Sequence, residues 1–125
     1  MKTVSIEEIV FFHRKIIEKT GGAIGIRDLG LVESALNKAL LTFDGKDLYK
    51  ELEEKISVIT FALIQNHGFV DGNKRIGISV MLLLLRLNQI NIEYSQDELV
   101  SLGLGVADGK LNENDIRSWV QKHKV

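Results

Sequence analysis

Nine consecutive residues bring most of the reactive side chains of this sequence into one short stretch. The stretch runs from His67 to Arg75 and reads HGFVDGNKR. It holds an imidazole, a carboxylate and two cations between two apolar runs, Ile56 to Ile64 and Ile76 to Leu85. A charged group beside a protein core is costly unless it is paired or put to use. The placement of these charges therefore indicates a functional loop.

The second half of the stretch has the features of an anion site. If a helix begins near Asn73, its first backbone N–H groups have no intrahelical partner and point into the loop. Together with the helix dipole they attract an anion, and Gly72 lets a phosphate approach the backbone closely. Lys74 and Arg75 add positive charge at the N-terminal end of the helix, where the helix dipole favours acidic side chains. An anionic ligand resolves that conflict, and the arginine can bind a phosphate bidentately.

The first half of the stretch supplies a carboxylate and a titratable imidazole. Asp71 offers the hard oxygen ligands that Mg²⁺ uses when it is bound with a nucleotide. His67 lies at the end of the preceding predicted helix, and an imidazole there can accept a proton from an attacking hydroxyl. Phe69 is predicted to anchor the loop to the core. These groups suit phosphoryl or nucleotidyl transfer, in which positioning and charge neutralisation carry most of the catalysis.

A purely structural interpretation accounts for the same residues about equally well on physical grounds. His67 could close one helix, Asp71 or Asn73 could cap the next, and the two cations could lie in solvent. Nucleic-acid binding is a weaker interpretation, because no wider basic stripe or interleaved aromatic residues accompany the cations. A metal-hydrolase site is weaker still, since only His67 and Asp71 are closely spaced candidate ligands.

Helical periodicity and capping patterns predict that about six helices hold this loop in a compact, single-domain, all-α bundle covering residues 1–125. Thr42 to Lys46 is predicted to be a turn, and the alternation from Asn88 to Tyr94 is compatible with a short extended segment. The predicted helices run from the Ser5 capping box to Gly21-Gly22, from Leu29 to about Leu41, from about Asp47 to the loop, from about Asn73 to Asn88, from the Ser95 capping box to Asp108-Gly109, and from the Asn112 cap onwards.

Two features near the N-terminus have a structural interpretation. His13 lies between Val10 and Ile17 on the apolar face of the first helix, so a core histidine bonded to a carbonyl or carboxylate is favoured over a catalytic one. The glycine-rich segment from Gly21 to Asp28 follows no strand, which argues against a dinucleotide-binding fingerprint. Asp28 is predicted to cap the next helix instead.

Composition excludes several classes of function. Sixteen basic and seventeen acidic residues give a net charge of −1, so no global field favours a nucleic acid or an anionic membrane as a partner. The chain has no cysteine, which excludes disulfides and thiolate metal sites. No apolar signal segment follows Met1, and the longest apolar run is far shorter than the roughly 20 residues that span a bilayer. A cytoplasmic location is expected.

The stretch from His67 to Arg75 resembles the core motif of the Fic-domain family, His-x-Phe-x-Asp/Glu-Gly/Ala-Asn-x-Arg. It is most similar to the Doc (death-on-curing) branch, in which a lysine precedes the final arginine. The resemblance covers almost the whole chain. Its other parts are Ile6-Glu7-Glu8-Ile9 followed by His13, the Gly21-Gly22 break, Gly25-Ile26-Arg27-Asp28, and Glu33-Ser34-Ala35-Leu36.

This resemblance implies a Fic fold and a role for each motif residue, with ATP and Mg²⁺ as cofactors. His67 would deprotonate the hydroxyl of a target protein, and Asp71 would bind Mg²⁺. Most of the family carries glycine at the position of Lys74 and transfers AMP. In the Doc branch the lysine accompanies transfer of the γ-phosphate to a threonine of elongation factor Tu, which stops translation. The phosphate cradle would consist of Gly72, Asn73 and Arg75, and the long cation of Lys74 would also attract phosphate.

The chain is therefore expected to be the kinase toxin of a toxin–antitoxin pair. An AMP-transferase and a catalytically inactive binding module of the same fold are the alternatives. Two departures from the family pattern bear on this expectation. Gly68 stands where many relatives have proline, and the family's inhibitory motif is absent because Glu8 follows the Thr3-to-Glu7 spacing. Self-inhibition is not expected, so an antitoxin acting in trans is implied, for example as a helix in an apolar groove.

Overall fold

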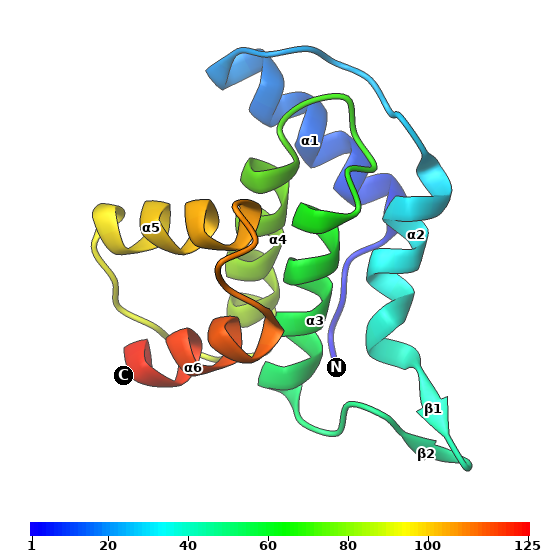
Figure 1. Cartoon of the computed structure of the whole chain (residues 1–125), viewed down its shortest axis with the longest axis vertical. Helices are drawn as coiled ribbons and strands as arrows, with labels where there is room; N and C mark the ends of the chain where they lie inside the picture. The colour runs from blue at the N-terminus through cyan, green and yellow to red at the C-terminus, as the bar shows by residue number, and fades with distance from the viewer.

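The computed structural model describes the whole chain, Met1–Val125. It contains six α-helices, one short 3-10 helix and one two-stranded antiparallel hairpin (Figure 1). The elements are α1 Ile6–Thr20, α2 Leu29–Asn37, η1 Lys38–Leu40, β1 Thr42–Phe43, β2 Lys46–Asp47, α3 Leu52–Gln65, α4 Asn73–Leu87, α5 Gln96–Ala107 and α6 Glu113–His123. The prediction of a helical bundle is confirmed, with the hairpin as an addition to it.

Local sequence signals account for several helix ends. Ser5 and Ser95 each form the predicted capping box. In it the serine hydroxyl accepts from the backbone N–H of the glutamate three residues later, and that glutamate's carboxylate accepts from the backbone N–H of the serine. Asn112 begins α6 in the same way. Gly21 ends α1 with a φ of 90°, a conformation that glycine adopts without a steric penalty. Asp28 occupies the cap position of α2 as predicted, but its side chain makes no capping hydrogen bond.

Helix α3 begins later in the chain than predicted. The helix was expected from about Asp47 but begins at Leu52, because the preceding residues form the hairpin of β1 and β2. Asp44 and Gly45 both have positive φ, 53° and 76°, which is the conformation of a two-residue hairpin turn. Lys55 then ties the hairpin to α3, since its ammonium donates to the carbonyl of Tyr49 and to the Asp47 carboxylate.

Helices α3 and α4 form the centre of the molecule, with α2 on one side and α5 and α6 on the other (Figure 1). The two helices pack on each other, and both carry completely buried residues such as Ile59 and Ile76. Gly77 permits this contact, because a Cβ at that position would lie 2.5 Å from Cγ1 of Ile64. The prediction that Gly77 marks close packing is thus confirmed, and the helix pair forms a rigid support for the loop that joins its two members.

The chain ends on the opposite side of the core from α2. The segment predicted to be extended between α4 and α5 does pair with another part of the backbone, through an isolated antiparallel bridge between Ile92 and Lys124. No helix in the structure has both the length and the apolar character needed to cross a membrane.

Candidate functional site

The loop from α3 to α4 lies at one end of the central helix pair, beside α1 (Figure 1). Helix α4 begins at Asn73, as predicted, and Gly72 precedes it in a left-handed conformation with a φ of 76°. No side chain caps this helix, whereas α1, α5 and α6 each have a complete capping box. The first N–H groups of α4 therefore remain open toward the loop and form an anion-binding end.

A cavity of about 340 Å³ adjoins this helix end. Its size is that of a small-ligand pocket. The structure brings six of the seven predicted site residues to this cavity, and the seventh, Phe69, does not line it. The lining consists of Ile64, His67, Val70, Asp71, Gly72, Asn73, Lys74, Arg75 and Ala107.

Phe69 anchors the loop, as predicted. Its side chain is 1% exposed, and its ring stacks on the imidazole of His13 with 3.8 Å between ring centroids and 13° between planes. The side-chain amide of Asn73 bonds the backbone N–H and the carbonyl of Phe69, each at 3.0 Å. That amide is thus engaged in holding the loop, and Asn73 offers a phosphate its backbone N–H rather than its side chain.

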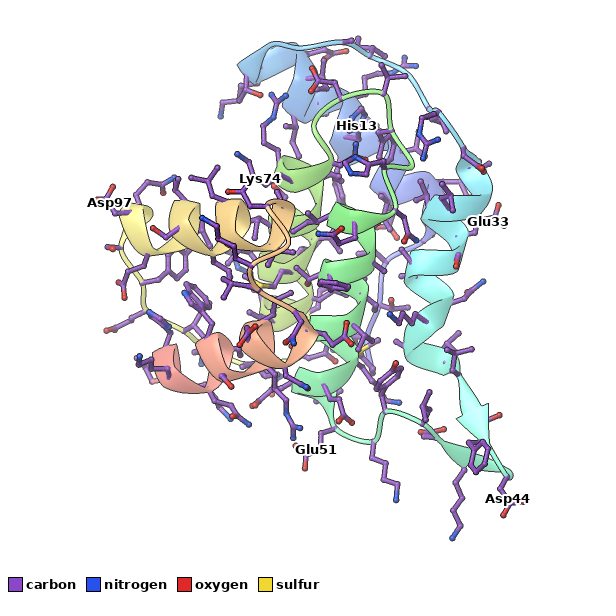
Figure 2. The ribbon with its side chains drawn as sticks, viewed as in Figure 1. His13, Glu33, Asp44, Glu51, Lys74 and Asp97 are labelled. Atoms are coloured by element: carbon purple, nitrogen blue, oxygen red, sulfur yellow. The ribbon has the colours of Figure 1, made fainter.

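His13 holds the loop from below and is not itself at the cavity. It is a buried residue of α1, labelled in Figure 2, and its Nε2 lies 2.7 Å from the carbonyl oxygen of Asp71. The ring nitrogen donates in this hydrogen bond, since the carbonyl can only accept. The interpretation of His13 as a core histidine bonded to a carbonyl is confirmed.

Asp71 is held in its ionised form. Its carboxylate accepts hydrogen bonds from the N–H of Ala23 at 3.1 Å and of Gly72 at 2.8 Å, and it lies 3.6 Å from Nη2 of Arg75. The two backbone bonds, followed by the Arg75 charge, keep the pKa of Asp71 below its ordinary value.

An ionised carboxylate is a hard ligand of the kind that Mg²⁺ prefers. Asp71 is the only acidic residue at the cavity, and nowhere in the chain do three acidic or histidine side chains gather to hold a metal. A Mg²⁺ ion commonly keeps several waters and binds one or two carboxylates together with substrate phosphates. The site therefore fits Mg²⁺ that arrives with a nucleotide and does not fit a resident metal cage.

The end of α1 positions Arg75. Its Nη1 donates to the hydroxyl of Thr20 at 2.6 Å and to the carbonyl of Gly21 at 2.7 Å. Gly22 makes this approach possible, because a Cβ there would clash with Oδ2 of Asp71 and lie 3.0 Å from Nη2 of Arg75. The predicted Gly21-Gly22 helix break therefore has a second role in shaping the site.

Lys74 is a cation without a partner. Its ammonium forms no hydrogen bond or ion pair in the structure, and its stem packs on α5, where a Cβ at Gly103 would lie 3.2 Å from Cγ of the lysine (Figure 2). An unpaired ammonium beside an open helix N-terminus adds to the attraction for phosphate.

His67 is exposed, and its backbone is unusual. It has a φ of 52°, in the left-handed region that non-glycine residues rarely occupy. The next residue, Gly68, is packed so tightly that a Cβ would lie 2.5 Å from Cγ2 of Val32. Close packing therefore restrains the loop at Gly68.

The segment between α1 and α2 supports the loop through contacts that sequence reasoning did not predict. Ile26 and Phe69 form an antiparallel bridge, and the N–H of Val70 donates to the carbonyl of Gly25 at 3.1 Å. The only signal in the sequence was the cluster of glycines itself. Ile24 and Ile26, which flank Gly25, are exposed, as is Val70, which lines the cavity. The contact of Gly25 with Val70 brings these three residues together as an exposed apolar rim next to the cavity.

Comparisons with known proteins agree with the motif. The model of the Fic/DOC family matches residues 3–85. The chain is similar to the protein kinase doc of Escherichia phage P1, with 26% identity over 125 residues that cover 98% of this chain and 95% of that protein. It is also similar to the toxin Doc of Mycolicibacterium smegmatis, with 33% identity over 72 residues. This second match covers 58% of the chain and 55% of that toxin.

Proposed function

Because this chain belongs to the Fic/DOC family, we propose that it is the toxin of a toxin–antitoxin pair and transfers the γ-phosphate of ATP to a protein hydroxyl. The observation that carries the proposal is the uncapped N-terminus of α4, which faces a cavity lined by an ionised carboxylate, an unpaired ammonium and an exposed imidazole. The similarity to a phage protein named as a protein kinase supports phosphate over AMP as the transferred group.

In the proposed reaction the hydroxyl oxygen of the target attacks the γ-phosphorus, and the bond from that phosphorus to the β-phosphate oxygen breaks, releasing ADP. His67 accepts the hydroxyl proton. The open N–H groups of α4, together with Lys74 and Arg75, bind and orient the phosphates and neutralise their charge. Asp71 would hold Mg²⁺, which supplies further charge neutralisation on the phosphate oxygens when it is bound.

The proposed target is a threonine of a translation factor, elongation factor Tu. The apolar rim formed by Ile24, Ile26 and Val70 supports a protein target, since exposed apolar groups gathered beside a site commonly mark a protein contact. The charged interior of the cavity would take the nucleotide, and the rim would take the segment that carries the hydroxyl.

The proposed antitoxin acts in trans through a groove of about 360 Å³ between α1, α4 and α5. Ile16, Ile78 and Leu99 line the groove and give it the apolar surface that the apolar face of an amphipathic helix would contact. The groove shares Lys74 and Arg75 with the cavity, so an occupant would lie against the phosphate-binding cations. Its occupation would therefore oppose nucleotide binding.

The groove can be tested with two matched positions on α5. Val100 lines it and is 46% exposed, whereas Leu104 is 44% exposed and does not line it. We expect Val100→Asp to reduce neutralisation by a co-expressed antitoxin, and Leu104→Asp to leave it intact. Equal neutralisation of both variants would place the antitoxin elsewhere.

Labelled ATP tests the reaction itself. The purified chain is incubated with elongation factor Tu, Mg²⁺ and ATP labelled on either the α- or the γ-phosphate. Label transferred from the γ position alone, and lost in His67→Ala, is the expected result. Label from the α position would instead indicate an AMP-transferase. Absence of label from both, with growth arrest surviving His67→Ala, would indicate a binding module.

A further inference from the structure

The side chain of Arg27 lies against the C-terminal end of α3 and holds the backbone of the proposed base. Its Nε donates to the carbonyl of His67 at 2.6 Å, and its Nη2 donates to the carbonyl of Asn66 at 3.0 Å. The last carbonyls of a helix have no intrahelical donor, and a cation is favoured there by the helix dipole. One guanidinium thus satisfies two consecutive carbonyls at the point where the helix becomes the loop.

This contact falls on a strained residue. The φ of 52° at His67 is costly for a residue with a Cβ, and such a conformation persists only when the surroundings hold it. The next residue is held by backbone groups, since the carbonyl of Gly68 accepts from the N–H of Arg27 at 2.8 Å and of Asp28 at 2.9 Å. The carbonyl of His67 has no donor other than the Arg27 guanidinium.

The nucleotide end of the loop is held separately. Asp71 is bonded by Ala23 and its own neighbour Gly72, and Arg75 is bonded at the end of α1. The Arg27 side chain forms no hydrogen bond with any of these groups, since its two bonds go to His67 and Asn66. Its removal would therefore release the residue proposed as base and leave the proposed phosphate cradle in place.

We propose that Arg27 is a positioning residue that holds His67 in its left-handed conformation and thereby directs the imidazole to the cavity. The inference rests on the proposed function for its catalytic consequence, but the backbone claim stands on the geometry of the chain alone. It gives a role to the Gly25-Ile26-Arg27-Asp28 segment, which lies 40 residues before the loop that it supports.

The kinetic test uses Arg27→Met, which keeps the length of the side chain and removes its donors. Misplacement of a catalytic group by about 1 Å can cost roughly 100-fold in rate. We expect kcat to fall by about 10- to 100-fold while KM for ATP stays within about twofold. Arg27→Lys retains a donor that reaches one carbonyl and should recover part of the loss. Arg14→Met, at an exposed arginine of α1 without a hydrogen-bond partner, is the matched control.

The structural test needs no activity. Backbone NMR couplings that report φ are measured at His67 in the labelled protein, with circular dichroism and the unfolding midpoint as controls for the fold. The expected result is a positive φ in the wild type and in Arg14→Met, and its loss in Arg27→Met. An unchanged φ at His67 in Arg27→Met would overturn the proposal. So would a kcat of Arg27→Met equal to that of the wild type, where the wild type transfers phosphate. If the wild type transfers no label, the proposed function fails, and the couplings still decide the role of Arg27.

Discussion

Replacing Gly22 with alanine tests how the end of α1 shapes the site. The substitution has two costs that the structure separates. The first is backbone strain, because φ is 116° at Gly22, where an L-residue loses on the order of 1–3 kcal/mol. The second is steric, because the new Cβ would meet Oδ2 of Asp71 and Nη2 of Arg75.

Gly21 provides the matched control. Its φ is 90°, but a Cβ there would meet no atom within 4 Å. Gly21→Ala should therefore lose only the stability that backbone strain costs. The difference in free energy of unfolding between the two variants then isolates the cost of the clash. To reach an ordinary contact distance, the Asp71 carboxylate must move by roughly 1 Å. A displacement of that size at a catalytic centre can cost about 100-fold in rate.

Both variants are assayed by denaturant unfolding and by Mg²⁺-dependent transfer from ATP. We expect backbone strain to lower the free energy of unfolding by a similar amount in both variants. Activity should fall, and the Mg²⁺ requirement should rise, in Gly22→Ala only. In the Asp71→Ala background, Gly22→Ala should cost less stability, because part of the clash is gone. If the two alanine variants have the same stability and the same Mg²⁺ dependence, the close approach of α1 to Asp71 is not as described.

The other predictions concern stability, pH and the metal. Phe69→Ala should destabilise the fold by about 3–5 kcal/mol in urea unfolding, whereas Phe11→Ala, at an exposed ring, should change it by less than about 0.5 kcal/mol; equal losses would refute the anchoring role. Asp71→Asn should raise the Mg²⁺ concentration needed for half-maximal transfer. If the Mg²⁺ dependence of transfer is unchanged in this variant, Asp71 is not a ligand of the metal. The ion pair of His123 with Glu98, at 2.7 Å, raises the pKa of the histidine and lowers that of the glutamate to about 2. Its stabilisation should be complete between the unfolded values of 4.5 and 6.5, decline as pH rises through the histidine's raised pKa, and decline as pH falls toward 2. The stability difference between wild type and His123→Gln, measured across pH, should therefore be greatest near pH 5 to 6, and a pH-independent difference would refute the pair.

The parts of the fold that depend on neighbouring residues could be predicted from the sequence. The capping boxes at Ser5 and Ser95 depend on residues three positions apart, and each begins a helix as expected. At the hairpin of β1 and β2, the turn was predicted but the paired strands on either side of it were not. The helical spacing of Leu48 and Leu52 continued the pattern of α3 backwards, while the positive φ of Asp44 and Gly45 and the half-buried Lys55 fixed a different structure.

The candidate site divides in the same way. Seven of the nine residues that line the cavity lie between His67 and Arg75, so their grouping is evident in the sequence, whereas Ile64 and Ala107 come from outside that stretch. Their supports are not contiguous with them. His13 reaches Asp71 across 58 residues, and Thr20 reaches Arg75 across 55, distances at which no local pattern carries information. The use of the Asn73 amide as a brace for Phe69 depended on loop geometry that only the structure provides.

We propose that the loop between α3 and α4 carries out phosphate transfer to a threonine of a translation factor. Mass spectrometry of elongation factor Tu after incubation with the chain, ATP and Mg²⁺ tests it most directly. We expect the mass of one phosphoryl group on a single threonine, present with the wild type and absent with His67→Ala. Addition of AMP, or a phosphoryl group that persists with His67→Ala, would contradict the mechanism proposed for this loop.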